Sequence, residues 1–272
     1  MASPRVMTLL LARAGGGAAV ATAIALGARR ARALSASGAA AAIIVGSATA
    51  SAGWNWGALL VIYFVAAVLL SRLGRAEKER ITGGVVAKGR ERDATQVGAN
   101  GGIFAALVLA GQFTSHHTSA IVATAALGAL AASAADTWAT EIGTLYGGTP
   151  RSVLTLRQLP AGTSGGMSAI GSLAMLAGAG FVALVAKGIA LPDAVVIVTV
   201  AGVAGALADS LVGATLQERR WCSACTLASE RVVHDCGVPT SLVGGREWID
   251  NDVVNLVATI VGAAVAALLT IL

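Results

Sequence analysis

The stretch LPDAVVIVTVAGVAGALADSLV, residues 191–212, is almost entirely apolar, and near its end the acidic Asp209 is followed by the hydroxyl of Ser210. About 20 apolar residues suffice for a helix to cross the hydrocarbon core of a bilayer. Comparable runs recur near residues 6–27, 34–52, 54–73, 97–113, 119–135, 165–186 and 253–272. The sequence therefore predicts an all-α, polytopic membrane helix bundle with about eight spans.

The composition also favours a membrane protein. Of the 272 residues, 56% are hydrophobic and 12% are charged, about half the roughly 25% charged residues of a soluble domain. The length fits a single integral-membrane domain over residues 1–272. Arg13 interrupts the first apolar run, and a cleaved signal peptide there would leave seven spans.

The basic residues divide the connections between spans into two sets. The short connections near 51–53, 114–118 and 188–192 nearly lack charge, whereas most of the 19 Lys and Arg lie in or beside the others. The positive-inside rule places that basic set in the cytoplasm. Cytoplasmic loops are therefore expected at 74–96, 136–164 and 214–251.

The acidic residues follow the same division, although anions do not obey the positive-inside rule. Of the 14 Asp and Glu, only Asp193 falls on the outer side. This clustering indicates a functional site at the cytoplasmic face. The net charge of +5 comes without a basic tail or aromatic–basic interleaving, so no nucleic-acid partner is expected.

The segment KGRERDATQVGANGG, residues 88–102, carries cations and amides directly into a span. Gln96 and Asn100 are four residues apart, so a helix places them on one face. Cations, amides and the free N–H groups of a helix start can together clamp phosphate. An ordinary basic flank of a span is the alternative.

Two spans end with Ala, Asp and a hydroxyl, at residues 135–137 and 208–210, and the span before each is opened by a Gly pair, at 101–102 and 165–166. We interpret this as a weak parallel repeat of spans four–five and six–seven, related by an axis along the membrane normal. Such an axis makes Asp136 and Asp209 face each other, a natural seat for Mg²⁺. Glu141 lies about 140° from Asp136 around a straight helix, so it reaches the same ion only if the helix bends or the side chain extends. Ordinary interfacial helix ends are the alternative.

The loop PAGTSGG, residues 160–166, precedes the sixth span. Its free backbone N–H groups suit a phosphate, but a flexible turn explains it equally well. It is not a Walker A loop, because no Gly-Lys-Ser/Thr follows.

The last loop carries the pattern Cys-x₂-Cys-x₈-His-x-Cys, and the final span follows a run rich in Asp and Asn at 250–255. Three sulfur ligands and one nitrogen form a Cys₃His zinc set; idle reduced thiols are the alternative, and a cytosolic disulfide is not expected. The expected zinc ligands are Cys222, Cys225, His234 and Cys236. Asp252 and Asn255 share a helix face, and a helix N-cap explains one residue of the run but not all of it.

In this order, the segments 88–102, 135–143, 160–166, 209–217 and 251–255 resemble the family of the plant phytyl-phosphate kinase of vitamin E synthesis and the animal transmembrane protein 19. The resemblance covers roughly residues 35–272. It implies an integral-membrane kinase that transfers the γ-phosphate of a nucleoside triphosphate, expected to be CTP, to a prenyl monophosphate. The acceptor would be phytyl, geranylgeranyl, farnesyl or a similar phosphate, and Mg²⁺ the cofactor.

The resemblance also implies roles for individual residues. Mg²⁺ would be held by Asp136, Glu141 and Asp209. Phosphates would be neutralised by Lys88, Arg90, Arg92 and Arg151. Substrate and nucleotide contacts are expected from Asp93, Gln96, Asn100, Gly101, Gly102, Thr137, Gly162, Thr163, Ser164, Gly165, Ser210, Gln217, Asn251, Asp252 and Asn255. A transporter or flippase for a lipid phosphate or small solute, using the same intramembrane carboxylates, is the alternative.

Overall fold

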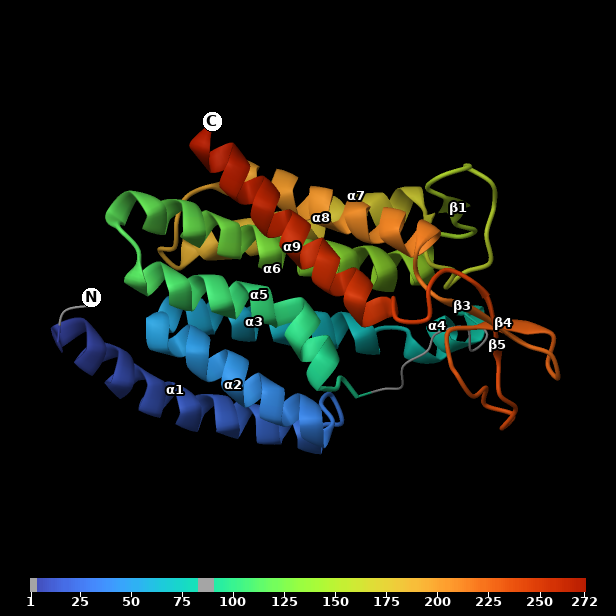
Figure 1. The fold of residues 1–272 in the computed structure, drawn as a ribbon, viewed down its shortest axis with the longest axis horizontal. Helices are drawn as coiled ribbons and strands as arrows, with labels where there is room; N and C mark the ends of the chain where they lie inside the picture. The colour runs from blue at the N-terminus through green and yellow to red at the C-terminus, as the bar shows by residue number, and fades with distance from the viewer. Residues whose placement is uncertain (1–3, 83–90) are drawn as a thin grey trace.

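The computed structural model describes residues 4–82 and 91–272, in which long apolar helices form one bundle. Figure 1 shows these helices running along a common direction, with α4 and the strands gathered at one end. The helices are α1 (Pro4–Arg30), α2 (Ala36–Ala52), α3 (Trp54–Arg72), α4 (Arg75–Thr82), α5 (Ala94–Ala110), α6 (His116–Tyr146), α7 (Ala169–Gly188), α8 (Val195–Thr215) and α9 (Asn251–Ile271), with a 3₁₀ turn η1 (Gly111–Phe113). The predicted all-α membrane bundle is confirmed.

The helices differ in whether they are long and apolar enough to cross a membrane. In the described part of the chain, six helices are long and apolar enough to cross a membrane: α3, α5 with η1, α6, α7, α8 and α9. Helix α2 is apolar but has only 17 residues, and α1 contains Arg13 and three consecutive glycines. The figure of about eight spans stays a prediction.

Helix α6 forms the centre of the bundle, and its middle is fully buried and made mostly of small residues. A Cβ atom on Gly128 would lie 2.4 Å from the carbonyl oxygen of Gly262 in α9. A Cβ atom on Gly205 of α8 would lie 2.4 Å from the Cβ of Ala132. Because lipid is as apolar as the helices, close packing of small residues holds such helices together.

Helix α6 is longer than expected, which corrects the loop predicted from residue 136. It continues to Tyr146, so Asp136 and Glu141 are helical. No proline or glycine lies between Asp136 and Glu141. The helix ends at Tyr146, where Gly147 and Gly148 follow, and Gly148 has a φ of +64°. Glycine at a helix C-terminus adopts that conformation at the lowest cost.

Helix α7 starts later than expected, at Ala169 instead of residue 165. Ser168 is its N-cap, and the Ser168 hydroxyl accepts a hydrogen bond from the N–H of Gly171 at 3.0 Å. Gly165 and Gly166 therefore belong to the preceding loop. This loop forms a short antiparallel pair, β1 (Arg151–Ser152) with β2 (Gly166–Met167).

The predicted loop 214–251 contains a small antiparallel sheet with the order β4-β3-β5. Its strands are β3 (Arg219–Cys222), β4 (Leu227–Ser229) and β5 (Ser241–Gly244). The buried Arg220 forms ion pairs with Glu218 at 2.8 Å and with Glu247 at 3.1 Å. The sheet stands at the same end of the bundle as β1 and α4 (Figure 1).

Candidate functional site

A cavity of about 940 Å³ extends along the bundle. Toward the start of α3 it is apolar. At the end of the bundle where the strands gather (Figure 1), which we call the polar end, the lining residues carry acidic, amide and hydroxyl groups. The apolar part includes Val20, Ile24, Trp54, Leu60, Val61 and Phe64. The cavity can thus receive a molecule with a long apolar chain and a charged head.

Two carboxylates from different helices meet at the polar end. Asp136 of α6 and Asp209 of α8 both line the cavity and lie close enough to repel each other electrostatically. The Oδ2 atom of Asp209 is buried and has no hydrogen-bond partner among the described residues. A buried carboxylate oxygen without a hydrogen-bond partner is stabilised by a proton or a cation beside it. Both residues lie at one end of the bundle, as the repeat predicts, although the symmetry relation itself stays a prediction.

Glu141, the third predicted Mg²⁺ ligand, is engaged by a cation that the sequence did not single out. The ammonium of Lys78 in α4 lies 2.5 Å from Glu141 Oε2, and it also donates to the carbonyl oxygens of Leu70 and Ser71 at 2.9 and 3.2 Å. Lys78 is 8% exposed. Glu141 still lines the cavity, so its role as a metal ligand stays a prediction beside this ion pair.

Glu230 lines the cavity, and no motif in the sequence singled it out. Its Oε1 atom accepts hydrogen bonds from Ser164 Oγ and from Gln217 Nε2, each at 2.9 Å. Ser164 belongs to the Gly-rich loop and Gln217 follows α8, so Glu230 joins two predicted site segments. Its only signal in the sequence was its position between the two halves of the Cys/His pattern.

The start of α5 is built as a capping box. Asp93 accepts a hydrogen bond from the N–H of Gln96 at 3.0 Å, and Gln96 Oε1 accepts one from the N–H of Asp93 at 3.2 Å. This pattern satisfies two free N–H groups of the helix start. Asp93 therefore caps the helix and is not among the residues that line the cavity.

Gln96 and Asn100 both line the cavity, as their predicted common face requires. Asn100 Oδ1 accepts a hydrogen bond from Ser133 Oγ of α6 at 2.5 Å. The same Ser133 Oγ lies 2.6 Å from the hydroxyl oxygen of Tyr63 in α3. The chain of polar groups fixes the side chain of Asn100 between three helices.

Arg92 also lines the cavity, and its backbone is held in place. The N–H of Arg92 donates to Ala33 at 3.1 Å, and its carbonyl oxygen accepts from the N–H of Ser35 at 3.0 Å. The guanidinium lies 5.9 Å from the centre of the Phe64 ring, a cation–π distance. A cation is thus anchored where the α1–α2 turn meets α5.

The predicted residues therefore divide into three groups. Those that line this cavity are Arg92, Gln96, Asn100, Gly101, Asp136, Thr137, Glu141, Gly162, Thr163, Ser164, Gly165, Asp209, Ser210, Gln217, Asn251 and Asn255. Those that lie elsewhere are Asp93, Gly102, Arg151 and Asp252. Lys88 and Arg90 lie outside the described residues.

Besides Asp93, two residues of the second group have structural partners. The Thr95 hydroxyl donates to Asp252 Oδ2 at 2.7 Å, which ties the start of α9 to the start of α5. The N-cap of α9 is Asp250, which accepts from two backbone N–H groups. Arg151 is exposed and donates to the carbonyl oxygen of Leu156 at 3.0 Å.

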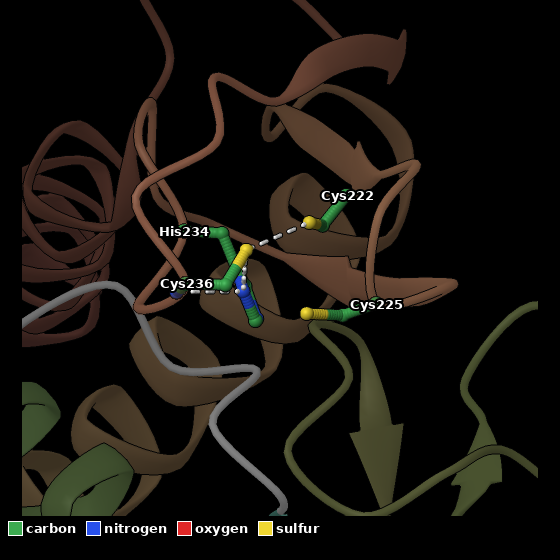
Figure 2. Close-up of side chains that lie close together, drawn as sticks. All are labelled: Cys222, Cys225, His234 and Cys236. Atoms are coloured by element: carbon green, nitrogen blue, oxygen red, sulfur yellow. Dashed lines mark hydrogen bonds between the residues drawn. The ribbon is translucent and has the colours of Figure 1, made fainter.

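The four predicted zinc ligands converge at the edge of the small sheet. Figure 2 shows the side chains of Cys222, Cys225, His234 and Cys236 close together. Their ligand atoms all lie within 4.8 Å of one another, and within the described ranges this is the one group of three or more His, Cys, Asp or Glu found to converge in this way.

The thiols of this cluster influence one another. A hydrogen bond from the N–H of Val238, together with His234, lowers the pKa of Cys236 to about 6. The neighbouring sulfur of Cys236, together with partial burial, raises the pKa of Cys225 to about 11. Closely spaced thiolates repel each other, and a bound cation removes that repulsion.

The fold and cavity define a polytopic α-helical membrane protein whose cavity is apolar along the bundle and polar at one end. The chain belongs to the family described as "Integral membrane protein DUF92", which matches residues 19–263. This match confirms the family resemblance inferred from the motifs.

Named relatives come from a plant and an archaeon. The chain is 31% identical over 228 residues to Protein PGR of Arabidopsis thaliana, which covers 75% of this chain and 77% of that protein. It is 30% identical over 215 residues to Protein VTE6, chloroplastic, of the same plant, which covers 78% of this chain and 57% of that protein. It is 29% identical over 221 residues to the uncharacterized membrane protein MJ0933 of Methanocaldococcus jannaschii, covering 78% and 74% of the two chains. No solved structure matches.

Proposed function

We propose that this protein is a membrane-embedded kinase that transfers the γ-phosphate of a nucleoside triphosphate, CTP by resemblance, to a prenyl monophosphate. The observation that carries the proposal is the 940 Å³ cavity, in which an apolar region along the bundle leads to the carboxylates Asp136 and Asp209. A prenyl phosphate has the matching shape, with a hydrocarbon tail and an anionic head.

The apolar part of the cavity suits the tail. Its volume of about 940 Å³ is near the upper end of the roughly 300–1,000 Å³ common for ligand pockets. A membrane-embedded groove keeps such a tail out of water, which explains why a small-molecule kinase would reside in a bilayer. Membrane lipids would be its neighbours on the outer surface of the bundle.

The polar end suits two phosphate-bearing substrates. Asp136 and Asp209 would hold Mg²⁺ with substrate phosphates as the remaining ligands, and the ion would neutralise charge on the transferred group. Arg92 lines the cavity, and Lys88, Arg90 and Arg151 would add cations from flanking segments. Donors from Asn100, Thr137, Ser210 and the loop 162–165 would orient the phosphates.

The proposed reaction does not require a strong general base. The acceptor phosphate has a second pKa of about 6, so at pH 7 most of it is dianionic and nucleophilic. Its oxygen forms the new bond to the γ-phosphorus, while the bond from the γ-phosphorus to the bridging oxygen breaks and the nucleoside diphosphate leaves. The protein's task is then to position two polyanions and balance their charge.

The polar end would face the cytoplasm, where nucleotides are available. The support is the distribution of Lys and Arg, most of which lie in the connections at this end.

An assay of phosphate transfer tests the proposal. Purified protein in detergent is incubated with Mg²⁺, CTP or another nucleotide labelled at the γ-phosphate, and prenyl monophosphates of several chain lengths. Labelled prenyl diphosphate is expected, and Asp209→Asn should lower the rate by about 10²-fold or more. Asp193→Asn is the matched control, since Asp193 pairs with Lys187 at the other end of the bundle.

Full activity of Asp209→Asn would rule out this site. A transporter is the second candidate, favoured by the length of the cavity and the buried, unpartnered oxygen of Asp209. Absence of transfer with every nucleotide, together with prenyl-phosphate movement across reconstituted vesicles, would support it instead.

A further inference from the structure

The small sheet β4-β3-β5 has almost no apolar core of its own. Of the apolar side chains in residues 219–244, only Cys222 is fully buried. The exposed ones include Trp221, Leu227, Val232, Val233, Leu242 and Val243. A module that buries so little apolar surface needs another source of stability, such as a metal or a disulfide.

Two turns bring four ligands to one point. Cys222 ends β3 and Cys225 lies in the turn before β4, where Thr226 has a φ of +53°. The second pair, His234 and Cys236, lies on a turn closed by the bridge between residues 233 and 239. Structural zinc sites commonly take two ligands from each of two such turns.

The distances fit one tetrahedral zinc ion. Zn–S bonds of about 2.3 Å and Zn–N bonds of about 2.0–2.1 Å place two sulfurs about 3.8 Å apart and a sulfur and a nitrogen about 3.5 Å apart. The Sγ atoms of Cys222 and Cys236 lie 3.6 Å apart, and Nδ1 of His234 lies 3.3 Å from Cys236 Sγ. Figure 2 shows Cys225 completing the group from the opposite turn.

We propose that Cys222, Cys225, His234 and Cys236 bind one structural Zn²⁺, and that this ion holds Glu230 at the polar end of the cavity. Glu230 lies between the two ligand pairs in sequence, and its carboxylate accepts hydrogen bonds from Ser164 and Gln217. Fixing both turns fixes the segment between them. The zinc thereby positions Glu230 in the lining of the cavity, although the ion itself does not contact the cavity.

Metal content tests the zinc directly, independently of the kinase proposal. Protein purified without chelator is analysed by inductively coupled plasma mass spectrometry, and about one zinc per chain is expected. Cys225→Ser should lose it, whereas Ser223→Ala, an exposed residue of the same turn, should retain it. Cobalt substitution should give the visible absorption of tetrahedral, thiolate-bound Co²⁺ in the wild type.

A conservative replacement separates metal binding from folding. His234→Cys supplies a fourth thiolate and should keep the zinc, while His234→Ala should lose it. Zinc below about one tenth per chain in the wild type, or a disulfide between Cys222 and Cys236 in freshly purified protein, would overturn the proposal.

Limited trypsin digestion tests the positional role. Cleavage after Arg219, Arg220 and Arg231 should accelerate at least tenfold when a chelator removes the metal, and added Zn²⁺ should reverse this. Glu230→Gln should keep its zinc and its resistance to trypsin but raise the KM for the phosphate acceptor, a readout that rests on the proposed kinase activity. Equal cleavage rates with and without metal would refute the role of zinc in holding this segment.

Discussion

The centre of the bundle and the small sheet at its polar end are stabilised in opposite ways. Around α6, small residues are fully buried and backbones approach within van der Waals contact. In the sheet β4-β3-β5, large apolar residues are exposed and four metal-ligand side chains converge. Helix packing positions the carboxylates Asp136 and Asp209. Glu230, in our proposal, is positioned by the metal bound to the Cys/His cluster on either side of it in the sequence. The two regions should therefore respond differently to the same kinds of change.

The largest effect is expected from adding volume where α6 meets α9. Gly128→Val would push a side chain into the Gly262 carbonyl oxygen, which lies 2.4 Å from the position of the new Cβ. Backbone atoms cannot yield as a flexible side chain can, so we expect a loss of about 3 kcal/mol or more, and little folded protein. Gly180→Val is the control, because nothing lies within 4 Å of its Cβ position. Size-exclusion profiles in detergent measure the outcome, and equal yields of the two variants would contradict it.

The next effect concerns the ion pair between α4 and α6. Lys78→Met leaves Glu141 without its cation at a largely buried site, and losing one partner of such a pair costs about 3 kcal/mol. Arg75→Met breaks the exposed pair with Glu79 on the same helix, where about 0.5 kcal/mol is expected. Thermal unfolding in detergent compares the two variants. Similar stabilities would mean that Lys78 and Glu141 are well solvated.

A pair of truncations compares the two regions directly. Leu130→Ala empties a fully buried site in α6 and should cost about 2 kcal/mol, because the cavity and lost dispersion contacts remain even where lipid reduces the transfer contribution. Val243→Ala in β5, which is 64% exposed, should change stability by less than about 0.5 kcal/mol. The measurement is again thermal unfolding in the same detergent. A larger effect in the sheet would mean that its apolar residues bury a surface not evident from the exposed fractions.

The smallest effect is expected at the junction between the regions. Ser164→Ala removes one of the hydrogen-bond donors to Glu230, and one such hydrogen bond contributes about 1 kcal/mol. Given the proposed activity, the KM for the phosphate acceptor should rise about fivefold with kcat nearly unchanged. Ser47→Ala is the control, since its hydroxyl donates to the carbonyl oxygen of Ile43 in the same helix and Ser47 is not among the residues that line the cavity. An unchanged KM would show that this contact does not shape the site.

The amino-acid sequence alone determined the features that depend on local composition and spacing. The apolar runs predicted membrane helices, because their length and hydrophobicity suit a bilayer regardless of tertiary contacts. The common face of Gln96 and Asn100 followed from helical periodicity. The Cys/His set could be recognised because its ligands lie within one short segment, and the family followed from motifs in order.

Only the tertiary structure decided which distant groups meet. Lys78 pairs with Glu141, and Glu230 meets Ser164 and Gln217, through contacts between segments that no local pattern connects. The end of α6 at Tyr146 was also missed, because polar residues that suggested a loop lie instead along the wall of a cavity. Apolar length specifies that a helix crosses a membrane, but a polar side chain near its end acquires a role only from the helices packed around it.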